Sequence, residues 1–144
     1  MASTIAEKQA EIVGEFAAIE DWRDRYRHII ELGRQLPDLP EELRNDKFKV
    51  KGCQSQVWLL PSLEDGKVVY RADSDAAIVK GLVAIVLRVF SGHSPDEILA
   101  SKPDFVDQIG LSEHLSQTRA NGLSAMLKQI QMYALAMKAV AARA

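Results

Sequence analysis

Residues 56–90, QVWLLPSLEDGKVVYRADSDAAIVKGLVAIVLRVF, contain two short apolar segments, a turn and a long apolar run. The segments QVWLLPSL (56–63) and KVVYRA (67–72) are rich in β-branched and aromatic residues, which are typical of strands. The letters EDG (64–66) between them are typical of a turn, so the sequence predicts an antiparallel hairpin. The run DAAIVKGLVAIVLRVF (75–90) is apolar on most sides, which predicts a helix that lies against the sheet as the central core element.

This apolar helix has recognisable ends and one interruption. Ser74 is of the residue type that caps a helix N-terminus, and Gly92 is of the type that closes a C-terminus. Lys80 and Gly81 interrupt the apolar run. A lysine in this setting usually packs its stem on the surface with its ammonium group in water. A glycine inside a helix costs about 1 kcal/mol relative to alanine, so Gly81 predicts close packing against another element.

A third strand is expected before the hairpin. From Lys47 the apolar pattern changes from a period of about 3.6 to one of 2, because Phe48 and Val50 alternate with Lys47, Lys49 and Lys51. The three segments together predict a small antiparallel sheet of about three strands.

Helical patterns flank this sheet in the sequence. Before the sheet we expect a helix over residues 4–19 with the capping-box pair Thr4 and Glu7, and a helix from Asp21 that Pro37 and Pro40 end. After the apolar helix we expect a short helix opened by the capping box of Ser94 and Glu97, and another that Gly110 ends. A long helix over residues 119–144 follows. In the last helix Met126, Met132 and Met137 are expected to fill the core. Runs of strands and helices indicate an α+β fold with helices on one face of the sheet, in one domain over residues 1–144.

The composition argues against several functions. With 18 Lys and Arg against 20 Asp and Glu, the formal net charge is −2, and the mixed signs do not form the one-sided basic surface of a nucleic-acid-binding protein. One cysteine cannot form an internal disulfide, and the segment MASTIAEKQAEIVGEF lacks the features of a signal peptide, so we expect a cytoplasmic protein. Apolar runs such as VWLL are far shorter than the roughly 20 residues that span a bilayer, so no membrane association is expected.

The single cysteine, Cys53, lies in the segment GCQS between two predicted strands. An unpaired cysteine is most often a small buried hydrophobic residue. Cys53 differs because Gly52, Gln54 and Ser55 place it on a polar loop, where glycine lets the backbone take unusual angles and a partner approach closely. The sequence therefore indicates a presented thiol.

Lys51 is adjacent to this thiol, and Lys49 and Lys47 alternate behind it. Their positive field is expected to favour the thiolate over the thiol. The same lysines have an equally good structural explanation, because lysine on the outside of an edge strand discourages aggregation.

Most cysteine chemistry needs residues that this sequence does not supply. A Cys-His hydrolase needs an imidazole base, but His28 is expected on a helix and His93 at a helix end, which leaves His114, near Arg119, as the remaining candidate. Zinc and iron–sulfur sites need several closely spaced ligands, and no glycine-rich phosphate loop is present. A nucleophilic thiol that exchanges sulfur with another thiol needs no second catalytic residue. The residues leave two functions open: a sulfur acceptor, or a non-catalytic interaction or thiol redox-sensor domain.

Four blocks of sequence in order resemble the SufE/CsdE sulfur-acceptor family over nearly the full length. The blocks are Trp22 with Tyr26, Ile29, Ile30, Leu32 and Gly33; the run from Gly52 to Trp58, GCQSQVW; the run from Asp73 to Leu82, DSDAAIVKGL; and Arg119 with Gly122. Phe48 departs from the pattern, which has a polar residue five positions before the cysteine.

The resemblance implies the α+β fold shared with the IscU/NifU scaffold proteins and a role as a sulfur shuttle. A cysteine desulfurase of the SufS or CsdA type, which carries pyridoxal phosphate, would hold sulfur as a persulfide. Cys53 would accept the outer sulfur, stimulate the desulfurase and pass the sulfur to an iron–sulfur cluster scaffold. The shuttle would need no cofactor or metal of its own and would have no independent turnover.

The resemblance also implies a set of residues that support the loop or contact the partner: Lys51, Gly52, Gln54, Ser55, Ser74, Asp75, Lys80 and Arg119. Several have structural explanations as well. Ser74 and Asp75 are suitable helix-start residues, or alternatively place a helix N-terminus beside the thiol. Arg119 either caps a helix or pairs with a surface carboxylate, or it lies near Cys53. The resemblance favours a position near Cys53. The acceptor cysteine is expected to rest in an apolar shelter and to turn outward when the partner docks.

Overall fold

The predicted hairpin is present. In the computed structural model, which describes residues 3–143, strand β1 (Val57–Glu64) pairs antiparallel with strand β2 (Lys67–Ser74). Asp65 and Gly66 between them both have positive φ, 52° and 77°. This is the backbone of a two-residue type I′ turn, whose twist matches that of the strands and fixes their register.

The prediction of a third strand is wrong. Among residues 3–143 the sheet has two strands, and the lysine-rich segment contributes only an isolated bridge between Lys49 and Trp58. The Val50 amide donates to the Val57 carbonyl at 2.8 Å beside this bridge. Residues 46–48 form a turn immediately before it, so too little extended backbone is left for a strand.

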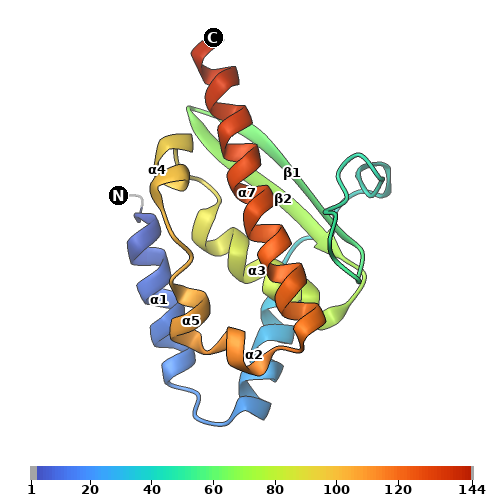
Figure 1. Cartoon of the computed structure of the whole chain (residues 1–144), viewed down its shortest axis with the longest axis vertical. Helices are drawn as coiled ribbons and strands as arrows, with labels where there is room; N and C mark the ends of the chain where they lie inside the picture. The colour runs from blue at the N-terminus through green and yellow to red at the C-terminus, as the bar shows by residue number, and fades with distance from the viewer. Residues whose placement is uncertain (1–2, 144) are drawn as a thin grey trace.

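Helices cover one face of the hairpin, as predicted for an α+β fold. Helix α3 (Ala77–Phe90) contacts β2, and helix α7 (Gln117–Arg143) contacts β1 (Figure 1). The strand residues that are buried in the core on this side are Val57, Leu59, Val68, Tyr70 and Ala72. Alternate residues of a strand point to the same face, which explains why the apolar pattern in the sequence predicted these two strands.

Helix α3 forms the centre of the core, as predicted, but it begins later than predicted. Ser74 is the last residue of β2 and not the N-cap; the N-cap is Ala76, whose side chain makes no capping hydrogen bond. The reason is that Ser74 pairs with Val57 in the hairpin. At the other end α3 stops at Phe90, close to Gly92, which has a φ of 86°.

Six further helical segments are present among residues 3–143. They are α1 (Ile5–Ala17), α2 (Trp22–Gln35), the 3-10 helix η1 (Glu41–Leu43), α4 (Pro95–Ala100), α5 (Phe105–Ile109) and α6 (Leu111–His114). The capping box predicted for α1 forms in full between Thr4 and Glu7. At α4, Ser94 accepts a hydrogen bond from the Glu97 amide, but the Glu97 carboxylate accepts one from the Ile5 amide at 2.8 Å and joins α4 to α1.

The glycine inside α3 marks a close helix crossing, as its position predicted. A Cβ atom built at Gly81 would lie 2.0 Å from the Ile29 carbonyl oxygen, and one built at Gly33 would lie 2.7 Å from the Gly81 amide nitrogen. The backbones of α2 and α3 therefore touch, and this contact fixes the first turns of α3.

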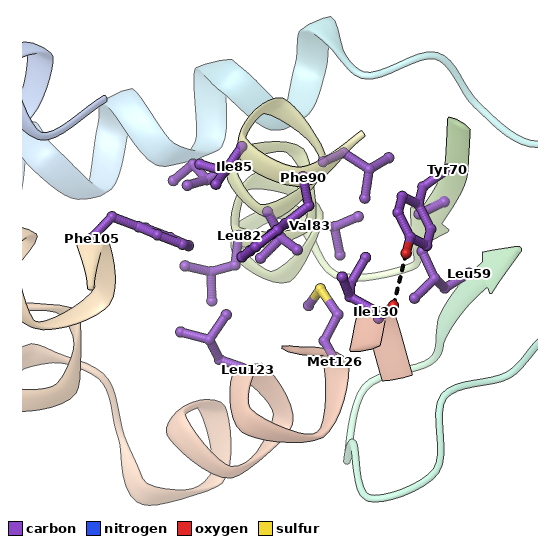
Figure 2. Packing of buried hydrophobic residues seen from close by; sticks show 14 of the residues in the cluster. Leu59, Tyr70, Leu82, Val83, Ile85, Phe90, Phe105, Leu123, Met126 and Ile130 are labelled. Carbon is purple, nitrogen blue, oxygen red and sulfur yellow. Dashed lines mark hydrogen bonds between the residues drawn. The ribbon is translucent and has the colours of Figure 1, made fainter. Parts of the chain in front are cut away.

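Helix α7 closes the core over α3 and the hairpin (Figure 2). The Tyr70 hydroxyl donates to the Ile130 carbonyl at 2.7 Å and ties α7 to β2. Met126 is buried and Met137 packs on the core, as predicted, but Met132 is 55% exposed. The prediction fails for Met132 because six residues turn a helix by about 240°, whereas eleven residues return to nearly the same side.

Candidate functional site

The loop over residues 51–56 carries the cysteine across the start of α7. Gly52 has a φ of +94°, a left-handed conformation that glycine adopts without strain. A Cβ atom at Gly52 would also lie only 3.2 Å from the Ala125 side chain on α7. Glycine before the cysteine is therefore explained by the turn of the backbone and by its packing on α7.

The Cys53 side chain is half-buried and turns toward α7. Its thiol donates to the Gly122 carbonyl across 3.5 Å. A Cβ atom built at Gly122 would lie 3.5 Å from the sulfur, so a longer side chain at this position would fill the space that the thiol faces.

A small cavity of ≈ 30 Å³ adjoins the sulfur. Such a volume is about that of one water molecule. Helices α3 and α7 supply its apolar wall through Val79, Leu82, Leu123 and Met126, whereas the loop, Thr118 and Arg119 supply its polar side. Of the expected support residues, Gln54, Ser55 and Arg119 thus lie together with Cys53.

Burial raises the pKa of the Cys53 thiol above its ordinary value. In this conformation burial outweighs the field of the neighbouring lysines, because desolvation disfavours the charged form. The lysines act elsewhere: Lys47, Lys49 and Lys51 line a separate groove on the protein surface. In this conformation the thiol is half-buried, and its protonated form is favoured.

Ser74 and Asp75 hold the end of the loop at Gln56. The Ser74 hydroxyl donates to the Gln56 carbonyl at 2.8 Å, and the Asp75 carboxylate accepts from the Gln56 amide at 3.1 Å. Since the bond between Val50 and Val57 closes the other end, residues 51–55 form a short segment between two fixed ends. Ser74 and Asp75 thus anchor the cysteine loop rather than cap α3.

Lys80 does not line the cavity. Its ammonium group pairs with Asp38 and lies 3.2 Å from a carboxylate oxygen of Asp73. Asp73 is fully buried and also accepts from the Leu39 amide at 2.9 Å and pairs with Arg44. The ammonium group of Lys80 was expected to lie in water. In the structure it belongs to a charged cluster with Asp38 and Asp73.

The pKa of Asp73 reflects two opposing effects. Burial alone would raise it, but hydrogen bonds from two backbone amides and from Lys80 lower it below the ordinary value. Asp73 was not predicted from the sequence as a site-supporting residue. The sequence feature that could have indicated it is an acidic residue at the end of a largely apolar strand, because a buried carboxylate needs partners.

The apolar residues of the cavity were also missed as site residues. The α7 residues that line the cavity lie on one side of the helix, because they are spaced by one, three and four residues. They are Thr118, Arg119, Gly122, Leu123 and Met126. That spacing was visible in the sequence, but apart from the position near Cys53 that the resemblance favours for Arg119, nothing indicated that this face meets the cysteine loop.

The remaining histidine candidate is not part of the cavity next to Cys53. His114 does not line the cavity; its ring stacks on Trp22 with centroids 3.8 Å apart. Within residues 3–143 no group of three or more His, Cys, Asp and Glu side chains is placed to hold a metal ion. In the same part of the chain, none of the helices has the length and apolar character needed to cross a bilayer.

The fold and the site define an α+β protein with one sheltered thiol on an anchored loop. Residues 10–134 match the model of the SufE family, described as an Fe-S metabolism associated domain, and the chain belongs to this family. It is 48% identical to an uncharacterized SufE-like protein of Rhizobium meliloti over 84% of this chain and 90% of that protein.

Other relatives and one solved structure agree. The identity is 47% to an uncharacterized SufE-like protein of Rhizobium etli, covering 84% of this chain and 85% of that one. The identity is 40% to an uncharacterized SufE-like protein of Synechocystis, covering 93% of this chain and 84% of that protein. The solution structure of a hypothetical protein from Thermus thermophilus is similar in fold, with a TM-score of 0.73, 24% identity, and coverage of 88% of this chain and 93% of that one.

Proposed function

We propose that this protein accepts sulfur on Cys53 from a pyridoxal-phosphate-dependent cysteine desulfurase, stimulates that enzyme, and delivers the sulfur to an iron–sulfur cluster scaffold. Membership of a family with a role in Fe-S metabolism supports the general process. The observation that carries the specific role is the position of the one thiol, which faces a small cavity with an apolar wall from a loop anchored at both ends.

The transfer is a thiol exchange that balances without an oxidant. The Cys53 thiolate attacks the outer sulfur of a desulfurase persulfide, a new S–S bond forms at Cys53, and the old S–S bond breaks. The electron pair of the broken bond leaves with the desulfurase cysteine as a thiolate. Cys53 then carries the persulfide, and its proton passes to the solvent or to the departing thiolate.

The resting conformation protects this chemistry from side reactions. Burial keeps the thiol protonated, and the protonated form neither oxidises nor exchanges readily. When residues 51–55 turn outward, Cys53 leaves the desolvated position and its pKa falls. Docking of the donor therefore selects the reactive conformation.

We assign the loop residues to this movement. Gly52 supplies the hinge, since its φ of +94° is open to few other residues. Gln54 and Ser55 form the polar rim that faces the donor, and Lys51 adds positive charge when the thiol is outside. Arg119, in the cavity wall, stabilises the thiolate or persulfide anion by charge.

The anchors have supporting roles. Ser74 and Asp75 hold Gln56 so that only the tip of the loop moves. Lys80 acts more remotely, through the Asp73 cluster that secures the end of β2. None of these residues needs to contact sulfur.

We further propose that the protein acts in the cytoplasm, with no cofactor of its own and no independent turnover, as a single domain with the fold of IscU/NifU scaffolds. One hydrophobic core with residues from α1 through α7 supports the single domain. The pyridoxal phosphate belongs to the desulfurase.

An intact-mass measurement tests the assignment. The protein is incubated with the desulfurase of the same organism and free cysteine, and Cys53 is expected to gain sulfur that dithiothreitol removes. The Cys53→Ser variant keeps the shape of the side chain but not the nucleophile, so it is expected to melt at the wild-type temperature, to carry no labile sulfur and not to stimulate alanine release.

Two results would contradict the proposal. Labile sulfur on the Cys53→Ser variant would place the acceptor elsewhere. A wild-type protein that takes no sulfur but forms a mixed disulfide rapidly with glutathione would favour the redox-sensor alternative. The raised pKa of Cys53 speaks against that alternative, because sensor thiols are exposed and of low pKa.

A further inference from the structure

A second hollow lies next to the cysteine loop, about two turns further along α7. Its volume is ≈ 720 Å³, and its wall includes Lys47, Lys49 and Lys51 from the segment before Cys53 and Lys128 from α7. Ala125, against which Gly52 packs, is also part of the wall. We call this hollow the lysine groove. It is distinct from the cavity of Cys53 but shares the loop with it.

The lysine groove is positive in a chain that is negative overall. Its wall contains four lysines and one carboxylate, that of Asp46, whereas the formal net charge of the chain is −2. All four lysines are exposed. Among residues 3–143 the lysines in ion pairs are Lys80 and Lys138, so the four groove lysines have no carboxylate partner there.

Strand-edge protection does not explain this arrangement. The segment that carries three of the lysines forms only the isolated bridge at Lys49, and a turn precedes it. The fourth, Lys128, comes from a helix, so two unrelated elements direct lysines into one groove. Four like charges brought together without a partner repel one another, which favours an anionic occupant.

The groove also contains apolar surface. Met132, which is 55% exposed, and the half-buried Tyr133 lie in its wall. A methionine adapts its shape to different apolar partners. A wall of this composition fits a protein segment with acidic and apolar side chains. It fits a nucleic-acid backbone less well, because the wall has no arginine, the residue that binds phosphate oxygens in pairs.

We propose that the lysine groove is the docking surface for an acidic segment of the cysteine desulfurase, whose carboxylates pair with the four lysines while an apolar side chain covers Met132. The identity of the donor rests on the proposed function; the chemistry of the segment rests on the groove. Because Lys51 and Gly52 connect the groove to Cys53, the docked segment contacts the loop at its hinge. Attraction to the groove also speeds the encounter and makes it sensitive to salt.

Matched charge reversals test the proposal. The groove variant changes Lys47, Lys49 and Lys128 to Glu and leaves Lys51 in the loop untouched. The control variant changes Lys8, Lys67 and Lys102 to Glu, which alters the net charge equally at sites outside the groove. Both are first shown by thermal unfolding to be folded, and the affinity for the loaded desulfurase is measured by calorimetry at low and high salt.

The groove variant is expected to bind roughly 10-fold or more weakly at low salt and to lose most of the salt dependence, whereas the control keeps both. Zero-length carbodiimide coupling joins amines to carboxylates in contact. In the wild-type complex it is expected to link the groove lysines to Asp or Glu of the desulfurase. Mass spectrometry of the digested complex identifies the linked peptides.

The outcomes separate docking from function. Equal affinities of the two variants, or coupling confined to lysines outside the groove, overturn the docking surface even if Cys53 gains sulfur. Loss of affinity in the groove variant, with no sulfur on wild-type Cys53, leaves the docking surface intact and overturns the sulfur-acceptor function. A wild-type protein that does not bind the desulfurase, or a groove that binds oligo(dT) instead, overturns the inferred occupant.

Discussion

The behaviour of Cys53 depends on the direction of its side chain. Turned inward, the thiol donates to the Gly122 carbonyl and burial raises its pKa. In the outward conformation that we propose, the thiol lies beside Lys51 in solvent, where a thiolate forms more readily. The proposal thus makes one residue unreactive in the free protein and nucleophilic in the complex. Arg119 lies in the same cavity wall, and in our proposal its guanidinium stabilises negative charge on the sulfur.

For Arg119→Ala we expect slower sulfur transfer with little change in stability. Removing one charged group that stabilises a developing anion costs roughly 10-fold or more in rate. Stability should change by no more than about 0.5 kcal/mol, because Arg119 is exposed. Single-turnover transfer from the desulfurase persulfide and thermal unfolding measure the two quantities.

Arg23→Ala is the matched control, since Arg23 is exposed on α2 and does not line the cavity. Wild-type transfer by Arg119→Ala together with a lowered melting temperature would make Arg119 a structural residue.

The cysteine loop is anchored at both ends, and its tip contacts α7 through the hydrogen bond from the Cys53 thiol to the Gly122 carbonyl. Gln56 is held by Ser74 and Asp75, and the bond between Val50 and Val57 closes the base. The remaining segment is short, polar and hinged at a glycine. The rigid base is itself supported by α3, whose position is set by its contact with α2.

Loosening one anchor should expose the thiol. Asp75→Ala removes the bond to the Gln56 amide, so alkylation of Cys53 by iodoacetamide at pH 8 is expected to accelerate about 2- to 10-fold, as for a bond worth about 0.5–1.5 kcal/mol. In both proteins the alkylation rate should still increase as the pH rises above the ordinary thiol pKa, because burial raises the pKa of the inward-facing thiol. Asp24→Ala, at an exposed pair on α2, should alkylate at the wild-type rate. An unchanged rate in Asp75→Ala would mean that this anchor does not restrain the loop.

The crossing of α2 and α3 predicts opposite effects for two glycines. Gly81→Ala places a Cβ atom 2.0 Å from the Ile29 carbonyl oxygen, so the helices must separate at a cost of about 3 kcal/mol or more. Gly14→Ala, in α1, meets nothing within 4 Å and should stabilise the protein by about 0.5–1 kcal/mol. Chemical denaturation measures both, and similar values for the two variants would refute the close crossing.

Charged groups join parts of the molecule that are distant in the sequence. The buried carboxylate of Asp73, at the end of β2, accepts from the Leu39 amide and contacts Arg44 and Lys80. It thus ties the segment after α2, the hairpin and α3 together near the loop anchors. A single carboxylate here holds three segments in place, which makes the site dependent on its charge.

For Asp73→Asn we expect a loss of about 3 kcal/mol in the free energy of unfolding at pH 7, because the cations and amides lose their charged partner. The pKa of Asp73 is lowered in the folded state, so its contribution is complete above the ordinary aspartate pKa and is lost as pH falls toward the native one. The difference between wild type and variant should therefore shrink below about pH 4.

Urea denaturation from pH 3 to 7 measures this difference. Glu31→Gln, which breaks an exposed pair with Arg34, should change stability by no more than about 0.5 kcal/mol across the range. A constant difference between wild type and Asp73→Asn at all pH values would exclude the carboxylate charge as the cause.

Local patterns in the sequence determined the hairpin, the apolar α3, the cap of α1, the close approach at Gly81 and the presence of one loop thiol. These depend on residues near each other in the chain, whose turn, capping and periodic preferences act locally. Only the tertiary structure decided that the lysine segment forms a bridge rather than a strand, that Ser74 anchors a loop rather than caps α3, and that burial outweighs nearby lysines at Cys53. Each of these depends on contacts between distant segments: a pairing partner, the position of Gln56, and the face of α7 that covers the sulfur. Burial and long-range hydrogen bonds arise from packing, so no local pattern specifies them.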